Sequence, residues 1–113
     1  MKMREINIKE NMPNVEDAKR LLLSEMTRAR FEKIHIIKVV HGYGSTGKGG
    51  AIKLAIPAFL KEQIKKNLIS DFICGEEFSA MNEKTRMLLS RYPELKKDRD
   101  YGMRNIGITI VVF

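Results

Sequence analysis

The residues best suited to chemistry in this chain lie in one glycine-rich segment, 41–50. This segment reads His-Gly-Tyr-Gly-Ser-Thr-Gly-Lys-Gly-Gly and holds five of the eight glycines. Glycines let backbone N–H groups approach an anion closely, and a helix that starts after them adds its positive N-terminal end. Lys48 and Lys53 add positive charge. The segment therefore predicts a phosphate-binding loop, and the alternative is a flexible turn without a ligand.

The same segment matches two nucleotide-binding patterns, but its context argues against both. Gly42-x-x-x-x-Gly47-Lys48 has the spacing of a Walker A loop, yet position 49 is glycine where magnesium binding needs serine or threonine. The dinucleotide fingerprint also fits the glycine spacing, but it needs a longer series of βαβ units than this chain provides. Both patterns bind an anion through glycine N–H groups and a helix N-terminus, and this common property still applies to the segment.

Several side chains in and beside this segment have two interpretations each. His41 could contact a phosphate or act as a general acid or base, or it could orient the loop through hydrogen bonds. Tyr43 could stack on a base or sugar, or cover the loop. Lys53 is favoured as a phosphate contact, whereas Lys61 and Lys65 on the same helix face are favoured as solvated. The predicted nucleic-acid-binding residues are Gly42, Tyr43, Gly44, Lys48, Gly49 and Lys53.

Hydrophobic patterns predict the elements that position the segment. Alternation at 4–9 predicts a half-buried strand. Apolar residues at three- and four-residue steps predict a helix from Val15 to Phe31, with Asn14 as its N-cap. Residues 34–41 are nearly all apolar and β-branched, so they predict a central strand that is buried on both faces.

The second half of the chain continues this alternation of strands and helices. A helix at 50–67 contains Pro57, which should kink it or start a new turn. The other predicted elements are a strand at 71–74, a helix at 82–92, a mobile loop at 96–104 and a strand at 106–113. The order β-α-β-α-β-(α)-β predicts one α/β domain over 1–113, a two-layer sandwich with a mixed sheet.

Composition narrows the class of protein further. The chain has 113 residues and a net charge of +7, which suggests a polyanionic partner. Residues 42–70 carry five basic side chains and one acidic one, which makes this stretch the most basic. The single cysteine, Cys74, is interpreted as an inert core thiol that allows no internal disulfide, and a cytoplasmic location is expected. No apolar run suggests a signal peptide or a membrane span.

Several of these features resemble the Smr (small MutS-related) domain. His41-Gly42-Tyr43-Gly44, placed between an apolar strand and a helix, resembles the His-Gly-x-Gly motif of that family. The helix that follows, at 51–60, and the closing strand with its glycine and threonine, at 107–112, also resemble the family, as does the beginning of the first helix at Val15. The resemblance covers most of the chain, from about Ile6 to Phe113.

The resemblance implies a fold similar to the C-terminal domain of translation initiation factor three, and binding of DNA or RNA. Several family members are endonucleases that carry Asp-Leu-His-Gly after the first strand, whereas this chain has Asn-Ile-Lys-Glu-Asn at 7–11. His41 and Glu10 remain as candidate catalytic residues, and a divalent metal would accompany cleavage. Residues 76–105 are interpreted as an insertion that could bind a protein partner. The alternative function is a protein-interaction module without nuclease activity.

Overall fold

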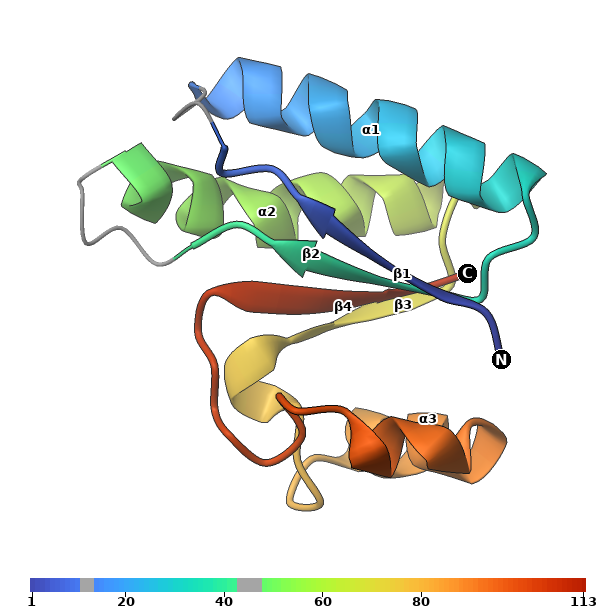
Figure 1. Ribbon diagram of the computed structural model, residues 1–113. Helices are drawn as coiled ribbons and strands as arrows, with labels where there is room; N and C mark the ends of the chain where they lie inside the picture. Colours follow the sequence, from blue (N-terminus) through green and yellow to red (C-terminus); the bar gives the residue numbers. More distant parts are fainter. Residues whose placement is uncertain (11–13, 43–47) are drawn as a thin grey trace.

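A mixed β-sheet combined with α-helices forms the fold, which we describe from a computed structural model (Figure 1). The structure describes residues 1–10, 14–42 and 48–113, with the backbone alone at 48 and 49. In chain order the described elements are β1 (Met3–Asn7), α1 (Val15–Phe31), β2 (Ile36–Val40), α2 (Lys48–Lys65), β3 (Asp71–Cys74), η1 (Gly75–Glu77), α3 (Glu83–Arg91), η2 (Pro93–Lys97) and β4 (Ile108–Val112), where η denotes a 3-10 helix. This order confirms the predicted α/β class.

The strand order β1-β2-β4-β3 places β2 and β4 at the centre of the sheet. β1 runs parallel to β2, and β4 runs antiparallel to both β2 and β3. The register aligns Asn7 with Val40, Val40 with Ile108, and Cys74 with Thr109. The carboxyl ends of β1, β2 and β3 therefore meet the start of β4 at one end of the sheet. At this same end the chain leaves β2 towards α2.

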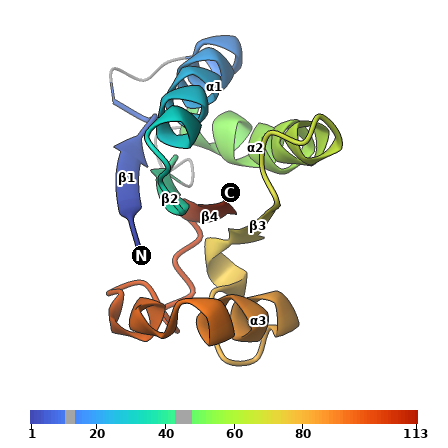
Figure 2. The same ribbon diagram turned by 90° about the vertical axis from the view of Figure 1, so that its right-hand side faces the viewer.

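α1 and α2 cover one face of the sheet, as Figures 1 and 2 show. Their apolar side chains pack on the strand residues that point the same way, which include Ile37, Val39 and Val111. α1 begins where it is predicted to begin, because the Oδ1 atom of Asn14 accepts a hydrogen bond from the N–H of Asp17 at 2.8 Å. The sheet and this pair of helices form the two-layer sandwich that the sequence predicts.

The segment between β3 and β4, with η1, α3 and η2, covers the opposite face of the sheet (Figure 2). A second apolar cluster forms there, made of Ile36, Ile73, Phe78, Leu88, Leu89, Leu95, Ile108, Ile110 and Val112. β2 is therefore buried on both faces, as its apolar sequence predicts. Lys38 is the one charged residue in this otherwise apolar strand, and its side chain is buried.

The structure differs from the sequence-based expectations at several boundaries. The mobile loop expected at 96–104 is anchored, because Asp98 and Asp100 form ion pairs with the buried amine of Lys38. The strand predicted at 34–41 is shorter, and α2 begins at Lys48 and continues through Pro57 as one helix. Among the residues described, none of the helices has the length and apolar character needed to cross a bilayer.

Gly75, at the start of η1, lies close to the backbone of Asn105 and to Ile108 of β4. A Cβ at this position would lie 1.9 Å from the backbone oxygen of Asn105 and 2.7 Å from Cγ1 of Ile108. We expect Gly75→Ala to lower the free energy of unfolding by about 3 kcal/mol, because backbone atoms would have to move. Urea denaturation of the variant and of the unmodified protein measures this loss.

Gly102→Ala is the matched control for this substitution. Gly102 has a φ of +77° and open space where a Cβ would stand, so its replacement meets backbone strain without a clash. We expect it to cost only about 1 kcal/mol. Equal losses in the two variants would contradict a structural need for glycine at position 75.

Candidate functional site

The carboxyl end of β2 is held by backbone hydrogen bonds on both sides. On one side the N–H of Ile8 donates to the carbonyl of Val40 at 3.0 Å. On the other side the carbonyl of Gly107 accepts from the N–H groups of both His41 and Gly42, each at 3.0 Å. The glycine-rich segment therefore leaves the sheet from a fixed point between the end of β1 and the start of β4.

Gly42 adopts a backbone conformation that favours glycine. Its φ is +74°, in the left-handed region, and a Cβ there would lie 3.4 Å from Cδ of Lys9. The stem of Lys9 lies beside this glycine. Lys9 belongs to the exposed stretch after β1, so its amine adds positive charge at this end of the sheet. Lys9 has no signal in the sequence that points to this site, because only the parallel pairing of β1 and β2 brings it here.

His41 is buried, and both of its ring nitrogens are hydrogen-bonded inside the protein. Nδ1 lies 2.7 Å from the carbonyl of Gly42, and Nε2 lies 2.9 Å from Oγ1 of Thr109. The carbonyl requires Nδ1 to donate, so in the neutral ring Nε2 accepts from the Thr109 hydroxyl. Burial lowers the pKa of His41, and the nearby Lys53 lowers it further, against opposing hydrogen bonds and Glu76. This geometry matches the loop-orienting interpretation of His41.

Lys53, on α2, lies beside the same end of the sheet and forms an ion pair with Glu76 of η1. Its Nζ is 3.1 Å from Oε2 and 3.4 Å from Oε1 of Glu76. Burial alone would raise the pKa of Glu76, but its backbone hydrogen bond and Lys53 outweigh burial, so the pKa is lowered. Lys53 is thus partly neutralised. The sequence gives no signal for Glu76, which folding brings here from 23 residues further along the chain.

The other predicted site residues do not all fall within the described structure. Glu10 is exposed after β1, and its N–H donates to Oδ1 of Asn7 at 3.2 Å. Tyr43 and Gly44 lie outside the described residues, as do the side chains at positions 48 and 49. The structure therefore brings together three of the predicted residues, which are His41, Gly42 and Lys53.

Cys74 ends β3 near this site and is partly buried. Burial raises the pKa of its thiol, and the charges of Glu76 and Glu77 raise it further. A thiol with a raised pKa carries little of the reactive thiolate, which agrees with its interpretation as an inert side chain.

Among residues 1–10, 14–42 and 48–113, no three His, Cys, Asp or Glu side chains are grouped so that they could hold a metal ion.

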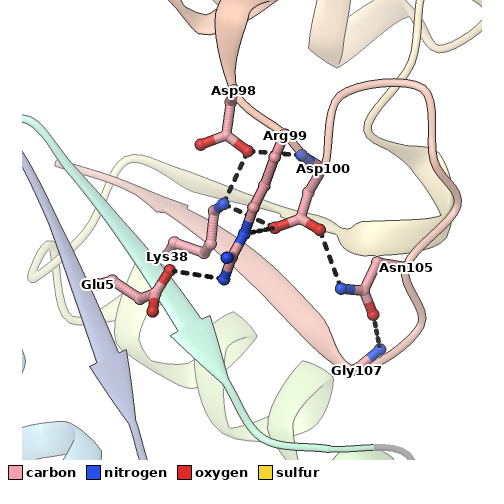
Figure 3. A network of polar contacts seen from close by, with 7 residues as sticks. All are labelled: Glu5, Lys38, Asp98, Arg99, Asp100, Asn105 and Gly107. Carbon is pink, nitrogen blue, oxygen red and sulfur yellow. Dashed lines mark hydrogen bonds and ion pairs between the residues drawn. The ribbon is translucent and has the colours of Figure 1, made fainter.

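A polar network on the opposite face of β2 reaches the same backbone (Figure 3). The Nζ atom of Lys38 lies 2.7 Å from Oδ1 of Asp98 and 2.6 Å from Oδ2 of Asp100. Burial alone would lower the pKa of Lys38, but its hydrogen bonds to these two carboxylates outweigh burial, so the pKa is raised. The pKa of Asp100 is lowered, because hydrogen bonds from Asn105 and Lys38 outweigh the effect of burial. Lys38 is therefore held as a cation.

Comparison of the chain with protein-family models, with curated proteins and with solved structures gave no match. The α/β fold follows from the structure itself. The relation to the Smr family, and with it the likeness to the initiation-factor domain, stays a prediction that rests on the sequence motifs.

The buried neutral ring of His41 predicts a stability that depends on pH in a known direction. Its pKa in the folded protein is below the unfolded value of about 6.5, so the unfolded chain binds more protons below that pH. We expect the free energy of unfolding to fall by up to about 1.4 kcal/mol between pH 7.5 and 5.5. Urea denaturation at the two pH values measures this fall.

His41→Gln is the control, because glutamine keeps an amide at this position that does not titrate. The chosen window lies above the range in which Asp100 and Glu76 take up protons, since both have lowered pKa values. The variant should therefore lose most of the pH dependence. A variant that keeps the full dependence would exclude His41 as its source.

Proposed function

We propose that this protein is an Smr-like nucleic-acid-binding domain, which contacts phosphates through the glycine-rich segment 41–50. The observation that carries the proposal is the turn at Gly42. It lies directly after a central strand, with the stem of Lys9 beside it and with Lys53 of α2 near the adjacent His41. α2 has no acidic residue in its first turn, whereas α1 has Glu16 and Asp17 there. Its positive N-terminal end is therefore free of opposing side-chain charge within the helix.

Charge supports a polyanionic ligand such as DNA or RNA. Residues 42–70 hold five basic side chains and one acidic one, and they include this turn and the whole of α2. Lys61 and Lys65 lie exposed further along the helix, which is consistent with their interpretation as solvated side chains. A cytoplasmic location, expected from the cysteine content, belongs to the same proposal.

Within this proposal, binding is better supported than cleavage. A general base needs a free lone pair near the reacting group, but both nitrogens of His41 are occupied by Gly42 and Thr109. His41 then acts by holding the start of the loop. Glu10 remains as a catalytic candidate on sequence grounds, and a divalent metal would accompany it. Incubation of the oligonucleotides used below with and without Mg²⁺, followed by electrophoresis, tests for cleavage directly.

A second candidate function, a protein-interaction module, is favoured by a groove beside α3. The groove lies between β3 and α3, has a volume of about 360 Å³, and is lined in part by Ile73, Leu88 and the exposed Met87. Charged side chains, among them Asp71, Lys84 and Arg91, also line it. A groove with apolar residues and polar residues together suits a protein partner. A protein-interaction module would not bind nucleic acid even at low salt, and this result distinguishes it from the proposed nucleic-acid-binding domain.

The salt dependence of binding tests the phosphate contacts. We expect affinity for labelled single-stranded DNA, duplex DNA and RNA to fall steeply with salt, because bound counterions are released. Lys48→Ala should reduce the slope of log K against log salt by about 1. Lys53→Ala should reduce it by less, because Glu76 already pairs with this amine, and Lys61→Ala should leave it unchanged. Fluorescence anisotropy at several salt concentrations measures the slopes. Absence of binding at low salt would overturn the proposal.

The ion pair between Glu76 and Lys53 predicts a variant with tighter binding. Glu76→Gln removes the carboxylate that lies 3.1 Å from the amine, so Lys53 becomes available to a phosphate. Because both side chains are partly exposed and solvent screens the pair, we expect an increase in affinity of only about two- to fivefold. Glu77→Gln changes the net charge equally but lies outside this ion pair. Similar affinities for the two variants would show that only net charge matters.

A further inference from the structure

Lys38 is an unusual residue for its place in the fold. It lies in the middle of β2 with 2% of its surface exposed, in a strand that is otherwise apolar. An ammonium group there loses its hydration, so it requires carboxylates with good geometry. An apolar side chain would suit the sheet at least as well. The ion pairs with Asp98 and Asp100 therefore call for an explanation other than stability.

The contacts continue from Lys38 to the end of its own strand. Oδ2 of Asp100 binds Lys38, while Oδ1 of the same carboxylate accepts from Nδ2 of Asn105 at 3.0 Å. Oδ1 of Asn105 in turn accepts from the N–H of Gly107 at 2.9 Å (Figure 3). The carbonyl of Gly107 then accepts the N–H groups of His41 and Gly42. The path thus returns to the chain just after β2, at His41, three residues beyond Lys38.

This closed path holds the end of β2 at two points. The side chain of Lys38 binds the segment 98–107 at one point, and the backbone of His41 and Gly42 binds it at the other. Arg99 adds a third link, since it lies 3.6 Å from Glu5 of β1 and 3.9 Å from Asp100. Asn105 is the only side chain on this path between Asp100 and Gly107, so it couples the buried charges to the backbone at the candidate site.

We propose that Lys38, Asp100 and Asn105 are positioning residues, which fix the backbone of His41 and Gly42 and thereby the direction in which the glycine-rich segment leaves the sheet. We expect this positioning to strengthen the binding of nucleic acid. This part of the inference rests on the proposed function. The two N–H groups bonded to Gly107 are not themselves ligand contacts. They set where the turn at Gly42 begins, and a preorganised turn loses less entropy when it binds a phosphate.

Asn105→Ala tests the proposal, with Asn82→Ala as the matched control. Asn82 also accepts a backbone N–H, that of Thr85 at 2.9 Å, but it caps α3 and lies outside the path. Hydrogen exchange measured by NMR on the full chain reports the amides of His41 and Gly42 separately. We expect their exchange to accelerate about fivefold more in Asn105→Ala than in Asn82→Ala, which corresponds to the loss of one hydrogen bond. The amide of Ile8, bonded to Val40, should respond equally in both variants.

Binding of the same labelled oligonucleotides gives the second readout. Asn105 carries no charge, so Asn105→Ala should weaken binding about fivefold at every salt concentration and leave the slope unchanged. A loss of phosphate contacts would change the slope instead. Asp100→Asn, which keeps the size of the side chain and leaves Asp98 with Lys38, should act in the same direction and serves as a second variant.

The two readouts separate failure of this inference from failure of the proposed function. Equal exchange at His41 and Gly42 in Asn105→Ala and Asn82→Ala would overturn the positioning role. Faster exchange with unchanged affinity would also overturn it, because the backbone would then not govern binding. If the unmodified protein binds no nucleic acid, the proposed function fails together with the functional half of this inference. The exchange data alone then decide whether the path fixes the backbone.

Discussion

The ion pairs between Lys38 and the two aspartates constrain how the segment between β3 and β4 packs on the sheet. β2 is covered by α1 and α2 on one face and by the segment after β3 on the other, so a charged side chain in it cannot reach bulk water. The amine instead draws Asp98 and Asp100 onto the sheet. Breaking such a buried pair is costly, although forming it adds little net stability. Its effect is geometric, because it fixes the path of the chain before β4.

That path matters because Gly107 and the start of β4 supply two of the partners of His41. Gly107 comes just before β4, and its carbonyl accepts the N–H groups of His41 and Gly42 at the end of β2. Thr109 lies within β4, and its hydroxyl donates a hydrogen bond to Nε2 of the His41 ring. The tight approach of Gly75 to Asn105 and Ile108 fixes the same region from the side of β3. Segments that are distant in sequence therefore converge on the backbone of His41 and Gly42 and hold it in place.

The sequence predicts this fold well where the signals are local. α1 matches its predicted range because Asn14 caps it and its apolar residues recur at helical steps. β2 is recognisable as a central strand because it is apolar throughout apart from Lys38. The role of Lys38 and the anchoring of 96–104 could not be predicted, since Lys38 binds Asp98 and Asp100 across 60 and 62 positions. Charged residues in a stretch such as 96–104 suggest solvent exposure until a buried partner is known.

The charge around the candidate site also could not be predicted from the sequence, because it depends on residues that are distant along the chain. Counted along the chain, residues 42–70 are strongly basic and residues 71–113 are neutral, which suggests that the positive charge near the glycines is unopposed. Folding places Glu76 from the neutral stretch against Lys53, and the local charge is lower than the sequence indicates. Lys9, from a different stretch, adds positive charge beside Gly42. The electrostatic field at the turn is thus set by side chains from three parts of the chain. Because Glu76 offsets Lys53, the positive N-terminal end of α2, which has no acidic residue in its first turn, contributes relatively more to the attraction of an anion.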